Sequence, residues 1–169
     1  MKKYVTNPLI WSMAWVIGLT ALDLYQKQWA ITHLSHGEAL PILPPLPHLA
    51  QWRLTYNTGG PWSMLHQVPF ALLLSGLLTT MGMLWFWAKT YKQKPKILWP
   101  FILIFSGAVG NLYNRISLGA VVDSIELLFI QYPIFNLADI YICTGLSLWL
   151  LSRLTPSSPT QPTSQQASS

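Results

Sequence analysis

Four long apolar runs constrain the fold of this chain more than any other feature. They lie approximately at Pro8–Ala30, Val68–Ala88, Ile97–Ile116 and Ile134–Leu151. Each run is close to the ~20 residues that an α-helix needs to cross the ~30 Å hydrocarbon core of a bilayer. Hydrophobic residues make up 51% of the chain and charged residues only 9%, unlike an ordinary soluble domain. The sequence therefore predicts an all-α membrane protein with four transmembrane helices.

The positive charges predict how these helices are oriented. Most lysines and arginines precede the first run, join the second to the third, or follow the fourth: Lys2, Lys3, Lys89, Lys92, Lys94, Lys96 and Arg153. Short loops rich in lysine and arginine stay in the cytoplasm, so we expect both termini there. The net charge of +5 then reflects orientation in the membrane, and no nucleic-acid partner is expected.

The pattern predicts one transmembrane domain over residues 1–154, with an extracytoplasmic loop at about 31–67. The tail, 155–169, is dominated by Ser, Thr, Pro and Gln without apolar periodicity, and predicts disorder. The first run is interpreted as a retained helix rather than a cleaved signal peptide. It lacks a clear small-residue cleavage site and carries Asp23 and Lys27 at its far end.

The extracytoplasmic loop contains one strand signal. Between residues 51 and 57, Trp52, Leu54 and Tyr56 alternate with polar residues. A period of two is typical of a half-buried strand. We therefore expect a small β-sheet on the outer surface of the membrane.

Polar residues within the apolar runs converge at one depth. Counted from the cytoplasmic edge, Asp23, Asn111 and Asp139 each lie 14 or 15 residues along a helix. At 1.5 Å per residue this is roughly 21–23 Å, some way below the outer surface. Lys27 and Arg115 follow Asp23 and Asn111 by four residues, and so share a helix face with them.

Three further residues are expected in the same zone. Asn136 lies one turn before Asp139, Asp123 lies in the short connection between the third and fourth runs, and Asn57 comes from the loop. Taken singly, Asn136 is explained as a helix cap, and Asp23 as the ion-pair partner of Lys27. Their convergence near a bilayer, where a carboxylate is costly and usually functional, favours a site instead.

Two carboxylates in a partly dry pocket cannot both ionise, so one takes a proton from water while the other donates to a carbonyl oxygen. Asp123 and Asp139 are the best pair for such peptide hydrolysis, because Asp23 is neutralised by Lys27. No metal or cofactor is expected. Four histidines gather in the loop without enough further ligands, and Cys143, the only cysteine, is expected to be a buried small hydrophobe.

Four short blocks, in order over roughly residues 8–152, match a known family: Asp23-Leu24-Tyr25-Gln26-Lys27; Tyr56-Asn57-Thr58-Gly59; Gly107-Ala108-Val109-Gly110-Asn111 with Arg115, Gly119 and Val121-Val122-Asp123; and Phe135-Asn136-Leu137-Ala138-Asp139 with Gly145. With these blocks the chain resembles the bacterial lipoprotein signal peptidases, the signal peptidase II family of four-span aspartyl peptidases. That family removes the signal peptide from prolipoproteins, cutting just before a diacylglyceryl-modified cysteine in the cytoplasmic membrane, and is the target of globomycin. The resemblance implies prolipoproteins and membrane lipids as partners.

The resemblance also implies roles for individual residues. Asp123 and Asp139 correspond to the catalytic pair. Substrate binding or support of the aspartates falls to Asn57, Gly59, Asn111, Arg115 and Asn136, while Asp23 and Lys27 hold the structure around the site.

Three positions depart from the family pattern. Asn114 stands where Asp is usual, Pro61 where Ala is usual, and Ser124 where an aromatic residue is common, which predicts a wetter pocket edge. A different class of function, a small non-enzymatic membrane carrier, would use Asp23, Asp139 and Arg115 as a relay. The almost uniformly apolar inner halves of the runs disfavour such a carrier, because transport needs access from both sides.

Overall fold

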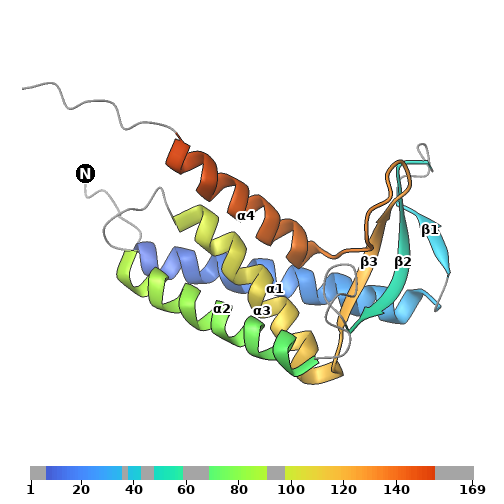
Figure 1. Ribbon diagram of the computed structural model, residues 1–169, viewed down its shortest axis with the longest axis horizontal. Coiled ribbons are helices and arrows are strands. Elements are labelled where there is room, and N and C mark those ends of the chain that lie inside the picture. Colours follow the sequence, from blue (N-terminus) through green and yellow to red (C-terminus); the bar gives the residue numbers. More distant parts are fainter. Residues whose placement is uncertain (1–6, 36–37, 43–47, 59–68, 91–97, 155–169) are drawn as a thin grey trace, which may run out of the picture.

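The computed structural model describes residues 7–35, 38–42, 48–58, 69–90 and 98–154. Within these residues there are four helices: α1 (Pro8–His33), α2 (Pro69–Thr90), α3 (Leu98–Leu118) and α4 (Leu137–Leu154). The same residues also form three strands: β1 (Ala39–Pro41), β2 (Ala50–Asn57) and β3 (Val121–Leu127). The helices form a bundle, and the sheet stands at one end of it, next to the start of α4 (Figure 1). The predicted helices and small sheet are therefore confirmed, whereas the tail 155–169, Gly59 and Pro61 lie outside the described residues.

The helices begin and end within a few residues of the predicted runs. α1 starts at Pro8, where Asn7 caps the first turn by accepting a hydrogen bond from the backbone N–H of Leu9 at 3.1 Å. Its 26 residues correspond to roughly 39 Å, more than the hydrocarbon core of a bilayer. In the described part of the chain, α1 and α4 are long and apolar enough to cross a membrane.

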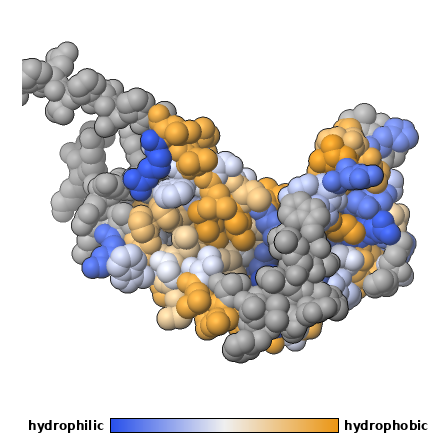
Figure 2. Space-filling view, viewed as in Figure 1, coloured by the Kyte–Doolittle hydropathy of each residue, from blue (hydrophilic) through white to orange (hydrophobic). Residues whose placement is uncertain are grey.

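The exposed faces of the helices are apolar. In α1, Ile10, Ile17 and Tyr25 are more than 60% exposed, while Asp23 and Lys27 are buried. Figure 2 shows hydrophobic surface along the helices and hydrophilic residues gathered towards the sheet. A helix that buries its polar residues and exposes its apolar ones is suited to a lipid environment.

α3 lies at the centre and contacts each of the other helices in the described chain. Its approach to α4 is very close at two glycines. A Cβ atom on Gly107 would collide with the carbonyl oxygen of Ala138, and one on Gly145 would lie 2.6 Å from the carbonyl oxygen of Pro100. Small residues of this kind let helix backbones meet.

The sheet has the order β1-β2-β3 with antiparallel neighbours. Asp123 lies in the connection between α3 and α4, as predicted, and belongs to the strand β3 within it. The strand β2 is confirmed, but the predicted alternation along it fails beyond a β-bulge, where the three steps from Trp52 to Thr55 match only two in β3. Past the bulge Tyr56 is 44% exposed, and Asn57 reaches Asp123. An extra residue in one strand shifts the side-chain alternation, and this aims Asn57 at the site.

A small apolar cluster fixes the sheet to the end of α1. Ala30 of α1 and Leu34, which follows the helix, pack against Leu54 of β2 and Val122 of β3, all buried, with Trp52 at the edge. Val122 and Asp123 are neighbours in β3, and neighbouring side chains of a strand point to opposite faces. Packing Val122 against α1 therefore turns Asp123 towards the opposite side of the sheet.

Candidate active site

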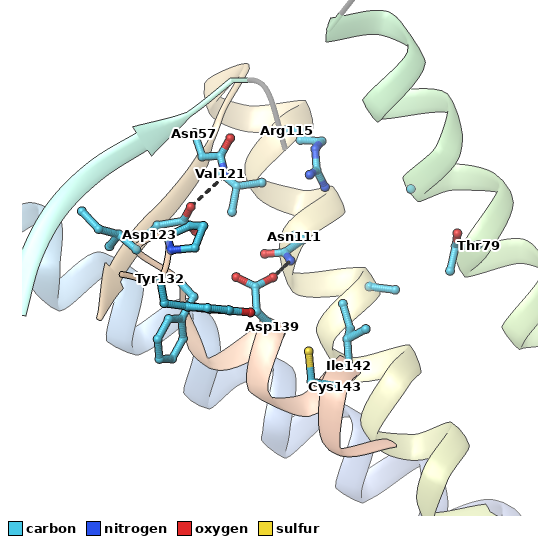
Figure 3. A pocket seen from close by; sticks show the side chains of 15 residues that line it. Asn57, Thr79, Asn111, Arg115, Val121, Asp123, Tyr132, Asp139, Ile142 and Cys143 are labelled. Carbon is cyan, nitrogen blue, oxygen red and sulfur yellow. Dashed lines mark hydrogen bonds between the residues drawn. The ribbon is translucent and has the colours of Figure 1, made fainter. Parts of the chain in front are cut away.

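A cavity of about 340 Å³ lies where the sheet meets α2, α3 and α4. Its walls include most of the polar residues that the sequence singled out: Asn57, Asn111, Arg115, Asp123 and Asp139. Figure 3 shows Asp123 on the strand side of this cavity and Asp139 on the helix side, with Asn111 between Arg115 and Asp139. The two predicted acids therefore border one common space.

Asp123 is held in the cavity wall by two amides. It is 2% exposed; its Oδ1 accepts a hydrogen bond from Asn136 Nδ2 at 2.6 Å and its Oδ2 accepts one from Asn57 Nδ2 at 2.9 Å. Burial raises the pKa of Asp123 to about 7, and the negative charge of Asp139 adds to this rise. The bonds from Asn57 and Asn136 oppose the rise without cancelling it. This carboxyl is therefore poised to hold or release a proton near neutral pH.

Asp139 lies in the first turn of α4 and is oriented by the backbone there. Its Oδ1 accepts a hydrogen bond from Asn111 Nδ2 at 3.0 Å, and its Oδ2 accepts one from the backbone N–H of Asn136 at 3.2 Å. In return the Asn136 side chain accepts a hydrogen bond from the backbone N–H of Asp139 at 3.0 Å. This reciprocal pattern is a capping box, so the expected capping role of Asn136 and its place in the site coexist.

Asn136 connects the two acids. It is fully buried, and its Nδ2 lies 2.6 Å from Asp123 Oδ1 and 3.3 Å from Asn111 Oδ1. Its backbone and side-chain oxygen hold Asp139 at the same time. One residue thus sets the positions of both carboxyl groups.

Asp23 and Lys27 lie behind the cavity rather than in its wall. Lys27 Nζ donates to Asp23 Oδ2 at 2.8 Å and to Asn111 Oδ1 at 2.9 Å, and Asp23 Oδ1 accepts from the backbone N–H of Ala138 at 2.9 Å. A lysine can only donate, so it fixes the oxygen of the Asn111 amide on its own side. The Asn111 Nδ2 is then directed to Asp139. The buried ion pair therefore links α1 to the first turn of α4 through α3.

Arg115 lines the cavity one turn beyond Asn111 on α3 and is half-buried. No carboxylate of the described residues lies within 4.0 Å of its guanidinium. The guanidinium, a group of hydrogen-bond donors only, therefore borders the cavity without forming an ion pair with either acid. A group in this position can bind the carbonyl oxygens of a peptide.

Several residues of the site were missed by sequence reasoning. Tyr132 and Phe135, from the segment between β3 and α4, line the cavity, and Tyr132 points across it towards Asp139 (Figure 3). Cys143 also lines it and is exposed, so its predicted burial is wrong. The spacing of four residues from Asp139 was the available signal, because it places both on one face of α4.

The departures at positions 114 and 124 have visible structural roles. Asn114 accepts a hydrogen bond from the backbone N–H of Val122 at 3.2 Å, and so supports β3 as an acid would. Ser124 is fully buried, and Gln26 Nε2 donates to its Oγ at 2.5 Å. Ser124 therefore faces α1 and not the cavity, and the predicted wetter pocket edge is wrong.

The geometry defines a class of protein. An apolar helical bundle carries at one end two aspartates in a common cavity, with a guanidinium and amides around them. Among the described residues no group of three or more His, Cys, Asp or Glu side chains is placed to hold a metal ion. Two carboxyl groups that share one cavity are the catalytic groups of aspartic hydrolases.

Comparison with known proteins identifies the family within this class. A model of the family described as Signal peptidase (SPase) II matches residues 15–155. A lipoprotein signal peptidase of Streptococcus thermophilus is 31% identical over 138 residues, covering 80% of this chain and 87% of the relative. One from Acinetobacter baumannii is 35% identical over 161 residues, covering 88% of this chain and 85% of the relative. The chain belongs to the signal peptidase II family of aspartic peptidases.

The fold is also that of a known structure. A bacterial membrane enzyme solved at 1.9 Å resolution superposes with a TM-score of 0.75 at 24% sequence identity, covering 86% of this chain and 94% of that one. The predicted four helices, the small sheet and the family are confirmed, and the alternative of a non-enzymatic carrier is not supported.

Proposed function

We propose that this chain is a membrane-embedded endopeptidase that removes signal peptides from prolipoproteins by cutting just before the diacylglyceryl-modified cysteine. Membership of the signal peptidase II family supports this activity. The observation that carries the proposal is the arrangement of Asp123 and Asp139, which border one cavity and are both held by Asn136. Asp123 and Asp139 together act as the catalytic pair.

The carboxyls divide the work of hydrolysis between them. Asp139 takes a proton from a water molecule, whose oxygen forms a bond to the scissile carbonyl carbon. Asp123, with its pKa raised to about 7, carries a proton and gives it to the carbonyl oxygen. When the tetrahedral intermediate collapses, Asp139 passes its proton to the departing amine nitrogen and the C–N bond breaks. Asp123 recovers the proton from the oxygen, so the pair returns to its starting state.

The surrounding polar residues bind the substrate or position the two acids. Arg115 and Asn57 lie at the cavity wall, where a substrate backbone would pass them, whereas Asn111 and Asn136 orient the acids. Asp23 and Lys27 hold Asn111 and the start of α4 in place. Gly59 is proposed to help bind substrate from the β2–α2 connection.

The helices α1 to α4 span the bacterial cytoplasmic membrane, with both termini in the cytoplasm and the sheet on the extracytoplasmic side. The charges of the connecting segments support this orientation. The acids then lie close to the outer surface but below it, where the bond next to a lipid-anchored cysteine is held by the membrane itself.

The proposal is tested with the purified full chain and a prolipoprotein that carries the diacylglyceryl group. We expect cleavage just before the modified cysteine, inhibition by globomycin, and no cleavage by Asp139→Asn, a change that keeps the volume of the side chain. The same prolipoprotein without lipid should remain intact. Intact lipidated substrate, under conditions where a relative from the family cleaves it, would contradict the proposal.

A further inference from the structure

A second hollow adjoins the catalytic cavity on the outer side of α4. It has a volume of about 270 Å³ and runs between α4 and the segment that follows β3. Leu127 and Ile130 form one wall, and Ile140 and Thr144 form the other. Figure 2 shows the molecular surface notched between α4 and the sheet. We call this hollow the side groove.

The side groove is continuous with the catalytic cavity. The two share Tyr132, Phe135, Asp139 and Cys143 among their lining residues. Asp139 is the only charged residue among the described residues that line the groove, and it lies at the shared end. Beyond that end the lining is mainly hydrocarbon. A molecule that reacts at Asp139 can therefore extend an apolar part directly into the groove.

The groove also opens towards the side of the bundle that faces lipid. Ile130 is 47% exposed and Ile140 is 40% exposed, although both are apolar. The same face of α4 continues to Leu148, one turn beyond Thr144, which is 42% exposed. An apolar channel with one end at a catalytic acid and the other in the bilayer suits a ligand that is reactive at its head and hydrocarbon at its tail.

We propose that the side groove binds one acyl chain of the diacylglyceryl group on the substrate cysteine. The inference rests on the proposed function, which puts that lipid one bond away from the cleavage point. The signal-peptide helix is the poorer occupant. A helix with its side chains is roughly 10 Å across, far wider than a single file of methylene groups. An acyl chain is slender enough, and its other end stays in the membrane.

The test compares two substrates with the same peptide, one carrying palmitoyl chains and one carrying acetyl groups on the glyceryl moiety. Thr144→Trp fills the groove from α4, and Ile130→Asp places a charge in the opposite wall. We expect each variant to raise KM for the palmitoyl substrate about tenfold, as when a hydrophobic site loses part of its fit. The KM for the acetyl substrate and both kcat values should stay unchanged. Leu148→Trp, a matched change on the same helix face outside the groove, should alter neither KM.

The outcomes separate the groove from the proposed function. If the unaltered protein cleaves neither substrate, the proposed function fails. If it cleaves both, and the groove variants change KM equally for the two substrates, the groove holds the peptide and the acyl assignment is overturned. No change with either substrate overturns it as well, and so does an equal effect from Leu148→Trp.

Discussion

The helices and the sheet of this protein follow opposite rules of burial. In α1 the fully buried side chains include Asp23 and Lys27, while Ile17 is 65% exposed. In the sheet, Leu54 and Val122 are buried, and the ion pair between Arg53 and Glu126, at 3.1 Å, lies towards the surface. The difference follows from the surroundings. In hydrocarbon, an apolar side chain gains little from burial, whereas a charged side chain is more stable inside the protein. In water, burial favours the apolar side chains instead. The cavity lies where the two rules meet, so it can combine buried charge with access to water.

The largest expected effect is on catalysis, at the cavity between the helices and the sheet. Asp123→Asn removes the proton that Asp123 donates while keeping the volume of the side chain and one acceptor oxygen, and should reduce kcat by about 10³-fold or more. Glu126→Gln, three residues along the same strand, is the matched control and should retain activity. The measurement is the turnover of a lipidated prolipoprotein. If both variants lost activity equally, a general effect on β3 would replace the catalytic role.

The next effect contrasts the buried ion pair with the exposed one. Lys27→Met leaves the carboxylate of Asp23 buried without its counter-charge and should lower the free energy of unfolding by about 3–5 kcal/mol. Arg53→Met breaks the partly exposed pair with Glu126 and should cost no more than about 1 kcal/mol. Thermal unfolding in detergent measures both. Adding Asp23→Asn to Lys27→Met should recover part of the loss, because the unpaired charge is then gone. Equal losses of unfolding free energy for the two single variants would show that the ion pair in the helices contributes no more than the ion pair on the sheet.

A smaller effect is expected at the contact between the two regions. Ser124→Ala removes the acceptor of the buried Gln26 amide and should lower stability by about 1–3 kcal/mol. Gln26→Leu combined with Ser124→Ala should cost less than Ser124→Ala alone, because no buried donor then remains unpaired. Unfolding of the single and double variants, compared as a cycle, measures the coupling. Additive losses would mean that this hydrogen bond does not join α1 to β3.

The smallest expected effect is a shift in pH dependence. A carboxyl with its pKa raised to about 7 keeps its proton below that value and loses it above, so kcat/KM should decline on the alkaline side from about pH 7. The hydrogen bond from Asn57 lowers the pKa of Asp123, so Asn57→Ala should move the alkaline limb to higher pH. The shift should be less than about one pH unit, equivalent to about 1.4 kcal/mol. Asn114→Ala, which removes an amide that does not touch Asp123, serves as the comparison. If the alkaline limb of the pH profile stayed in place in Asn57→Ala, the observed ionisation would not be that of Asp123.

Helix geometry made part of the site predictable. The rise per residue of a helix is fixed, so counting from the cytoplasmic edge was enough to expect Asp23, Asn111 and Asp139 at one depth. The structure places them in one chain of hydrogen bonds that runs through Lys27. The apolar runs themselves predicted the helices, because only a long hydrocarbon run fits a bilayer.

The sheet was harder to predict because its pairing is non-local. The sequence of β3, Val-Val-Asp-Ser-Ile-Glu-Leu, does not alternate, and its partner β2 lies more than 60 residues earlier in the chain. A bulge leaves no sequence signal as strong as an apolar run, yet it decides that Asn57 and not Tyr56 faces the acids. The residues after β3, including Tyr132 and Phe135, enter the site only through that tertiary arrangement.

Asn136 both closes the first turn of α4 and holds the carboxyl of Asp123. Fraying of that helix end and dispersal of the two acids are therefore a single event. Heat or detergent that unwinds this turn should therefore abolish turnover before the bundle itself comes apart.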